Sequence, residues 1–93
     1  MSKEITDNPE ASRYEIHVDG ALAGFAEYTT RPGEVVFTHT EIDKAFGGQG
    51  VGGALARGAL DEVRAKGGVN VVPQCSFIKS WIDKHPDYAD LVA

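Results

Sequence analysis

Residues 46–54 read Phe46-Gly47-Gly48-Gln49-Gly50-Val51-Gly52-Gly53-Ala54, and five of these nine residues are glycine. From Val51 onward apolar residues recur every four positions, at Val51, Leu55, Ala59 and Val63, which predicts a helix over residues 51–66. The Gly67-Gly68 pair ends this helix. Its first turn carries almost no side chains, so the backbone N–H groups there are able to hold a phosphate.

The chain before this stretch reads as a sheet. Alternating polar and apolar residues predict a strand that starts at Arg13, and Asp19-Gly20 is a hairpin turn signal. A second strand is expected over residues 21–30 and a third over residues 34–42, with Arg31-Pro32-Gly33 as the turn between them. Residues 13–42 are therefore predicted to form a three-stranded antiparallel meander, and residues 1–12 a flexible lead-in.

The chain after the first helix supplies one more strand and one more helix. Residues 69–72 form a short apolar run that suits a strand buried on both faces. A second helix is expected from about Ser76 to His85-Pro86, where His85 caps or stacks, followed by a short tail. The order β-β-β-α-β-α predicts an α/β (α+β) fold with a mixed four-stranded sheet and a right-handed crossover. We expect the two helices to pack on opposite faces of the sheet.

Length and charge restrict the class of protein. The chain has 93 residues, which predicts a single domain, and 9 basic against 14 acidic side chains give a net charge of −5. An acidic domain is a poor nucleic-acid binder, because such affinity rests on phosphate neutralisation by Lys and Arg. The single cysteine excludes an internal disulfide, and the three histidines are not spaced as metal ligands. We expect a cytoplasmic protein with no metal, no nucleic-acid partner and no membrane segment.

Two familiar phosphate-binding motifs do not account for the glycine-rich stretch. Gly48-x-Gly50-x-x-Gly53 matches the dinucleotide fingerprint literally, but the strand that follows ends in Pro73-Gln74 instead of an acidic residue. The Gly-Lys-Ser/Thr of a Walker motif is absent. From spacing alone, a glycine-rich helix start without any ligand stays an open alternative.

The glycine-rich stretch also resembles the signature of a known family. Gln49-x-x-Gly52-x-Ala54 is similar to the Q/R-x-x-G-x-G/A signature of the GNAT acetyltransferase superfamily. Three further segments resemble its minimal, CG-type branch of about 90–100 residues, and the four segments together cover roughly residues 13–92. The further segments are His39-Thr40-Glu41, Val71-Val72-Pro73-x-Cys75-Ser76-Phe77 and His85-Pro86-x-Tyr88-Ala89-Asp90-Leu91.

The resemblance implies a truncated GNAT-like core without the first strand and first two helices, and hence a more open acceptor cleft. It places the phosphates of acetyl-CoA on the N–H groups at the start of the first helix. The pantetheine arm would lie between the third and fourth strands, where the parallel neighbours separate. The expected cofactor-binding residues are Thr40, Glu41, Gln49, Gly50, Val51, Gly52, Gly53, Ala54 and Lys79.

Two residues are expected to act on the acetyl group, and His39 and Cys75 should line one cavity with it. His39 ends a strand beside the cleft, and histidine is the side chain most often used as a general base; the sequence alone favours a structural role, whereas the resemblance favours a general base. Cys75 opens the second helix and has three open roles: core packing, a covalent thioester carrier, or contact with the sulfur of CoA. Tyr88 is a third candidate, as a proton donor to the CoA thiolate, with core packing as its alternative.

The expected function is acetyl-CoA-dependent transfer of an acetyl group to a primary amine. The alternative is a non-catalytic CoA-binding, acyl-CoA-binding or sensor module, and a third interpretation is a purely structural domain. The acceptor is not specified by the sequence, and we expect a monomer or a weak dimer.

Overall fold

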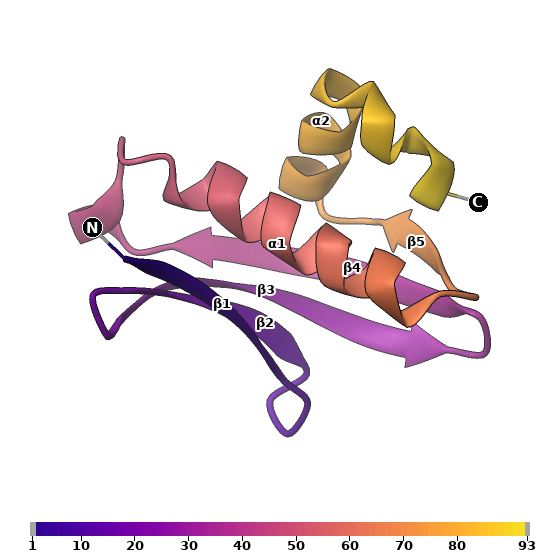
Figure 1. Cartoon of the computed structure of the whole chain (residues 1–93), viewed down its shortest axis with the longest axis horizontal. Helices are drawn as coiled ribbons and strands as arrows, with labels where there is room; N and C mark the ends of the chain where they lie inside the picture. The colour runs from indigo at the N-terminus through magenta and orange to yellow at the C-terminus, as the bar shows by residue number, and fades with distance from the viewer. Residues whose placement is uncertain (1, 93) are drawn as a thin grey trace.

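A computed structural model describes residues 2–92 of the chain (Figure 1). Its strands are β1 (Lys3–Asn8), β2 (Arg13–Val18), β3 (Ala21–Arg31), β4 (Glu34–Ile42) and β5 (Asn70–Pro73). Its helices are α1 (Val51–Lys66) and α2 (Ser76–Lys84), with two 3₁₀ helices, η1 (Lys44–Phe46) and η2 (Pro86–Leu91).

The strands form one mixed sheet in the order β1-β2-β3-β4-β5. Every neighbouring pair is antiparallel except β4 and β5, which are parallel because α1 connects them. The predicted α+β fold with a mixed sheet is confirmed. The number of strands is wrong, since the sheet has five strands and not four.

The extra strand, β1, lies within the segment expected to be a flexible lead-in. Residues 3–8 pair along their whole length with β2, and Ile5 lies opposite Ile16. Ile5 is the one apolar residue of β1, so the strand carries no alternating pattern that a sequence reading can detect. A polar strand suits the edge of a sheet, where polar side chains discourage pairing with other chains.

A glycine in the middle of α1 makes room for this strand. A Cβ atom added at Gly58 would collide with the side chain of Ile5. Because every larger residue at position 58 would push β1 away from the helix, Gly58 and Ile5 hold β1 and α1 together by their fit.

We therefore expect Gly58→Val to lower the free energy of unfolding by about 1–3 kcal/mol, through overpacking against Ile5. Urea denaturation measures this change, and Glu62→Val is the matched control because Glu62 is exposed on the same helix. The double variant Gly58→Val/Ile5→Ala should recover part of the loss. An unfolding midpoint that Gly58→Val leaves unchanged would contradict the packing described.

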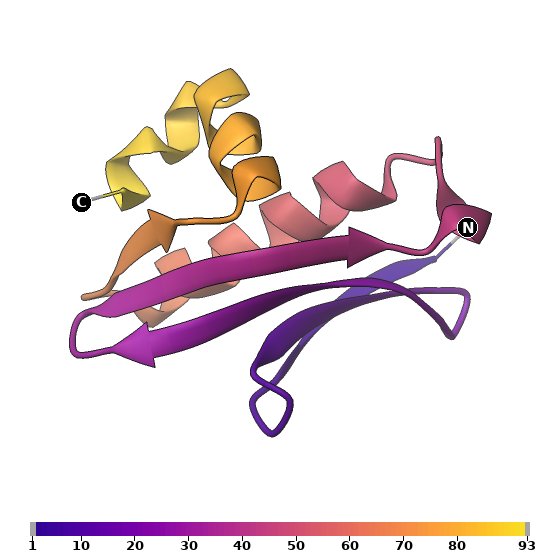
Figure 2. The same cartoon turned by 180° about the vertical axis from the view of Figure 1, so that it is seen from behind.

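Both helices cover the same face of the sheet. Leu55 of α1, Ile78 of α2 and Phe37 of β4 belong to one buried core. Seen from behind, β3 and β4 lie in front of α1 and no helix covers them (Figure 2). The expectation of helices on opposite faces is wrong.

Topology explains the shared face. The chain crosses from β4 through α1 to β5, and then through α2 and η2 to Val92, which bridges Val71 of β5 in parallel. Two right-handed crossovers that advance in the same direction across a sheet place both helices on the same side. The face opposite the helices carries the outward-pointing side chains of the meander.

The parallel strands separate halfway along β4. Pairing between them runs from Glu34↔Asn70 to Phe37↔Pro73, and the Cys75 N–H donates the last bond to the Phe37 carbonyl at 2.9 Å. Strand β4 continues to Ile42, so residues 38–42 have β3 on one side and no strand of the described chain on the other. This open edge faces the start of α2 and the loop that enters α1.

Candidate active site

The first turn of α1 presents backbone donors without side-chain competition. The N-cap is Gly50, which has φ +73° and therefore the left-handed conformation that favours glycine. No side chain caps the helix, and no acidic residue lies in its first turn. The first N–H groups of a helix have no partner within it, so those of Val51, Gly52 and Gly53 remain available to an anion.

The first turn of α2 lies against the first turn of α1. A Cβ atom added at Gly52 would lie 3.0 Å from Cζ of Phe77 and 3.7 Å from Cγ1 of Ile42. The first turn of α2 also has no acidic residue. Two helix N-termini and the end of β4 therefore meet at one place, where the partial positive charges of both helices add.

Cys75 lies at the open edge of β4. It is buried at the N-cap of α2, and its Sγ donates a hydrogen bond to Thr40 Oγ1 at 3.3 Å. Thr40 pairs with the core residue Ala26, so its side chain points toward the helices. Thr40 and Cys75 thus form the helix-side wall of the open edge.

His39 lies on the other face of the sheet. Its side chain is 54% exposed, its Nε2 lies 3.5 Å from Oε1 of Glu41, and its ring is 6.4 Å from that of Phe25. Neighbouring strand residues point to opposite faces, so Thr40 on the helix side places His39 away from it. The structure does not bring His39 and Cys75 into one cavity, and that expectation is wrong.

A β-bulge causes the difference. Tyr28 pairs with Phe37 while Glu27 pairs with His39, so Thr38 is an extra residue on β4. Without this bulge His39 would share the face of the buried Phe37, as simple alternation suggests. The shift turns the His39 side chain outward, so it lies next to the open edge of β4 on the face of the sheet that no helix covers.

The remaining expected cofactor residues lie in three places. Gln49 is exposed in the loop before α1, and Ala54 donates its N–H to the Gly50 carbonyl at 3.0 Å, so both belong to the start of the helix. Glu41 instead lies beside His39. Lys79 pairs with Asp83 one turn further along α2, with Nζ to Oδ2 at 3.6 Å.

Tyr88 is bound into a network with the middle of α1. Its hydroxyl donates to Asp61 Oδ1 at 2.7 Å and accepts from Arg57 Nη1 at 3.1 Å. Burial, followed by the bond to Asp61, raises the pKa of Tyr88, so the phenol stays protonated at neutral pH. This geometry favours the packing role of Tyr88 over a proton donor.

His85 behaves as the sequence suggests. Its ring stacks on Trp81 at 3.8 Å between centroids, and its Nδ1 lies 2.7 Å from the Trp81 carbonyl oxygen. The prediction that this histidine caps or stacks at the helix end is confirmed.

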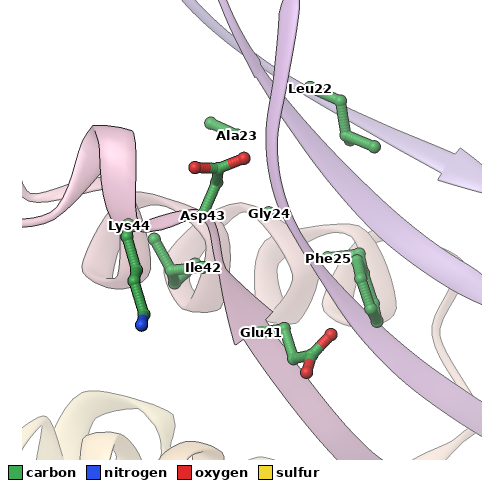
Figure 3. A pocket seen from close by; sticks show the side chains of 8 residues that line it. All are labelled: Leu22, Ala23, Gly24, Phe25, Glu41, Ile42, Asp43 and Lys44. Carbon is green, nitrogen blue, oxygen red and sulfur yellow. The ribbon is translucent and has the colours of Figure 1, made fainter.

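A surface hollow of about 360 Å³ lies where β3 and β4 pair near the end of β4 (Figure 3). Its wall includes Phe25 and Glu41, which face each other across the two strands. Both also lie beside His39. The full lining consists of Leu22, Ala23, Gly24, Phe25, Glu41, Ile42, Asp43 and Lys44.

Sequence reasoning did not find the hollow or the aromatic residue at the glycine loop. Within the described chain, the exposed large hydrophobic residues are Leu22 and Phe77, at 42% and 38%. One lines the hollow and the other lies over Gly52. An outward-facing Leu at position 22, next to the predicted Asp19-Gly20 turn, was the signal available in the sequence.

Over residues 2–92, no group of three or more His, Cys, Asp or Glu side chains is arranged to hold a metal ion. None of the helices in that range has the length and apolar character that crossing a membrane requires.

Comparisons with solved structures give the fold. A GCN5-like protein from Staphylococcus aureus superposes with a TM-score of 0.72 at 24% identity, over 97% of this chain and 87% of that one. A ribosomal-protein-alanine N-acetyltransferase from Brucella melitensis biovar Abortus 2308 gives 0.61 at 20% identity. That match covers 87% of this chain and 60% of the Brucella protein.

Comparison with models of protein families shows the family to which the chain belongs. No protein of curated function matches the chain. The model of the GCN5-related N-acetyl-transferase family matches residues 13–91, from the start of β2 to the end of η2. This span contains the glycine loop, the open edge of β4 and both helices, and it confirms the resemblance of the four sequence segments. The chain belongs to the GCN5-related N-acetyltransferase family.

Proposed function

We propose that the protein transfers an acetyl group from acetyl-CoA to a primary amine. The family supports acetyltransfer as the general chemistry. Acetyl-CoA as the donor and an amine as the acceptor are our assignments, and each rests on a separate part of the site.

The observation that carries the donor assignment is the meeting of two helix N-termini that have no acidic residue in their first turns. The N–H groups of Val51, Gly52 and Gly53 would bind the pyrophosphate, with Gln49, Gly50 and Ala54 bordering it. A Cβ at Gly52 would fill space next to Phe77, so glycine keeps this approach open.

The open edge of β4 supports the position of the pantetheine arm. Residues 38–42 offer backbone N–H and C=O groups that no neighbouring strand of the described chain uses. An extended amide-containing arm is able to pair with such an edge as an added strand does. The thioester would then lie between Thr40 and Cys75 on one side of the sheet and His39 on the other.

In the chemical step we assign the proton transfer to His39. The lone pair of the amine attacks the thioester carbonyl carbon, a C–N bond forms, and His39 takes the proton that the nitrogen releases. A backbone N–H of residues 38–42 would stabilise the oxyanion. The C–S bond then breaks, the CoA thiolate leaves and takes up a proton from solvent, and His39 gives its proton up to solvent, so the protons balance and the base is restored.

The experiment is an acetyl-transfer assay with the purified protein. Acetyl-CoA and a set of primary amines are supplied, release of the CoA thiol is followed, and the acetylated amine is identified by mass spectrometry. Amine-dependent thiol release above the rate without protein is expected. Binding of CoA without any such release would contradict the assignment and favour the alternative, a non-catalytic CoA-binding or sensor module.

Cys75 is expected to assist and not to carry the acetyl group. Its thiol is buried and already donates to Thr40, so direct transfer to the amine is the simpler route. Cys75→Ser keeps a donor to Thr40 and should lower the transfer rate less than about tenfold, the loss of one neutral hydrogen bond or contact. Intact-protein mass spectrometry during turnover should show no acetylated Cys75. Near-complete loss of activity together with an adduct would instead establish a covalent route.

A further inference from the structure

We propose that the hollow between β3 and β4 anchors the acceptor, and that this acceptor is a small amine with an apolar body and a second positive charge. The inference rests on the proposed acetyl transfer and adds the binding site and the substrate class. It is carried by the hollow itself, by its position beside His39, and by the chemistry of its walls (Figure 3).

The size of the hollow selects a small occupant. Its volume of about 360 Å³ is the volume that roughly a dozen water molecules occupy in liquid water. An alkyl chain of several carbons fits such a space. The apolar walls on the face of His39 come from Leu22 and Phe25, since the Ile42 side chain lies on the helix side, next to Gly52.

The position of the hollow links it to the reacting edge. Phe25 and Glu41 line it and also flank His39, at 6.4 Å between ring centroids and 3.5 Å between Oε1 and Nε2. His39 lies two residues from Glu41 along β4, and a strand rises about 3.3 Å per residue. An acceptor anchored in the hollow would therefore span about 7 Å to present its amine to His39.

The charges favour a cation over an anion as the anchored group. Two acidic residues, Glu41 and Asp43, line the hollow, but only one basic residue, Lys44, does so. Beside it, the Arg13 guanidinium lies 4.4 Å from the centroid of the Phe25 ring and is paired with Glu15 at 2.8 Å, so this ion pair adds no net charge to the hollow. Glu27 pairs with His39 across the strands, and further disfavours a negatively charged acceptor.

Three amines of equal chain length test the charge preference. Cadaverine, pentylamine and δ-aminovalerate carry the same reacting amine and differ at the far end in a positive, neutral or negative group. We expect kcat/KM to fall in that order, with about tenfold or more between the first and the last, as one charge contact near a surface gives.

Leu22→Lys tests the location. Leu22 is exposed, so the variant should fold, and its ammonium would enter the hollow without touching His39. The cadaverine to δ-aminovalerate ratio should fall about tenfold, the effect of one like charge near a surface. Thr30→Lys, exposed at the other end of the same strand, adds the same charge and should leave the ratio unchanged.

The outcomes separate this inference from the function beneath it. Equal use of cadaverine and δ-aminovalerate, or a ratio that Leu22→Lys does not change, would overturn the anchoring site while acetyl transfer stands. CoA binding without acetylation of any of the three amines would contradict the proposed transfer and the anchoring site together.

Discussion

His39→Ala is expected to lower acetyl transfer at saturating acetyl-CoA by about 10²–10⁴-fold, the usual contribution of a positioned general base. The imidazole is exposed on the helix-free face, beside the open edge of β4 and next to Glu41. Removing it should leave folding unchanged, since it contributes no buried contact to the core. The loss should lie in kcat, with CoA affinity preserved, because the glycine loop is on the other side of the strand.

His17→Ala is the matched control for this prediction. His17 lies on the same face of the sheet and pairs with Glu15 at 3.8 Å, but it is two strands away from β4. The transfer rate of this variant should stay close to that of the unchanged protein. Equal losses in the two variants would show a general effect of surface charge and would exclude His39 as the base.

Gly52→Asp is expected to weaken CoA binding by at least about 100-fold. The new carboxylate would lie in the first turn of α1, where a like charge within about 4 Å of a phosphate costs several kcal/mol near a protein surface. The added Cβ would meet Phe77 at 3.0 Å, but the Phe77 ring is partly exposed and is able to turn aside. The variant should therefore fold, and calorimetric titration with CoA measures the loss.

Two further variants separate charge from shape at this position. Gly52→Ala adds the Cβ alone and should cost less affinity than Gly52→Asp. Ala65→Asp places the same charge on the exposed last turn of the same helix and should leave CoA binding unchanged. Unchanged affinity in a folded Gly52→Asp protein would mean that the pyrophosphate binds elsewhere.

The helices and strands in which apolar residues recur at regular spacing were predictable from the sequence. The helix over residues 51–66 and the strand over residues 34–42 have the bounds that the apolar spacing indicates. In the helix, burial follows the apolar spacing, so local and tertiary preferences agree. In the strand only the bounds follow the sequence, because the bulge at Thr38 breaks the alternation of buried and exposed residues. Strand β1 was not predictable, because its single apolar residue, Ile5, is recognisable only once Gly58 of α1 lies against it.

The candidate site was predictable in its residues and only partly in its geometry. The glycine loop and Cys75 lie where the sequence put them, at the starts of two helices. The face of His39 depends on the bulge at Thr38, which shifts the register by one residue and leaves no signature in the composition of β4. The hollow requires the pairing of Phe25 with Glu41, a contact between strands that no local pattern contains.

The central claim, that CoA binds at the meeting of the two helix N-termini and along the open edge of β4, is tested most directly by an amide NMR titration with CoA. The largest shifts are expected at Val51, Gly52 and Gly53, at Phe77, and over residues 38–42. The last turn of α1, around Lys66, should not respond. Shifts confined to other parts of the chain, or no shifts at millimolar CoA, would contradict this claim.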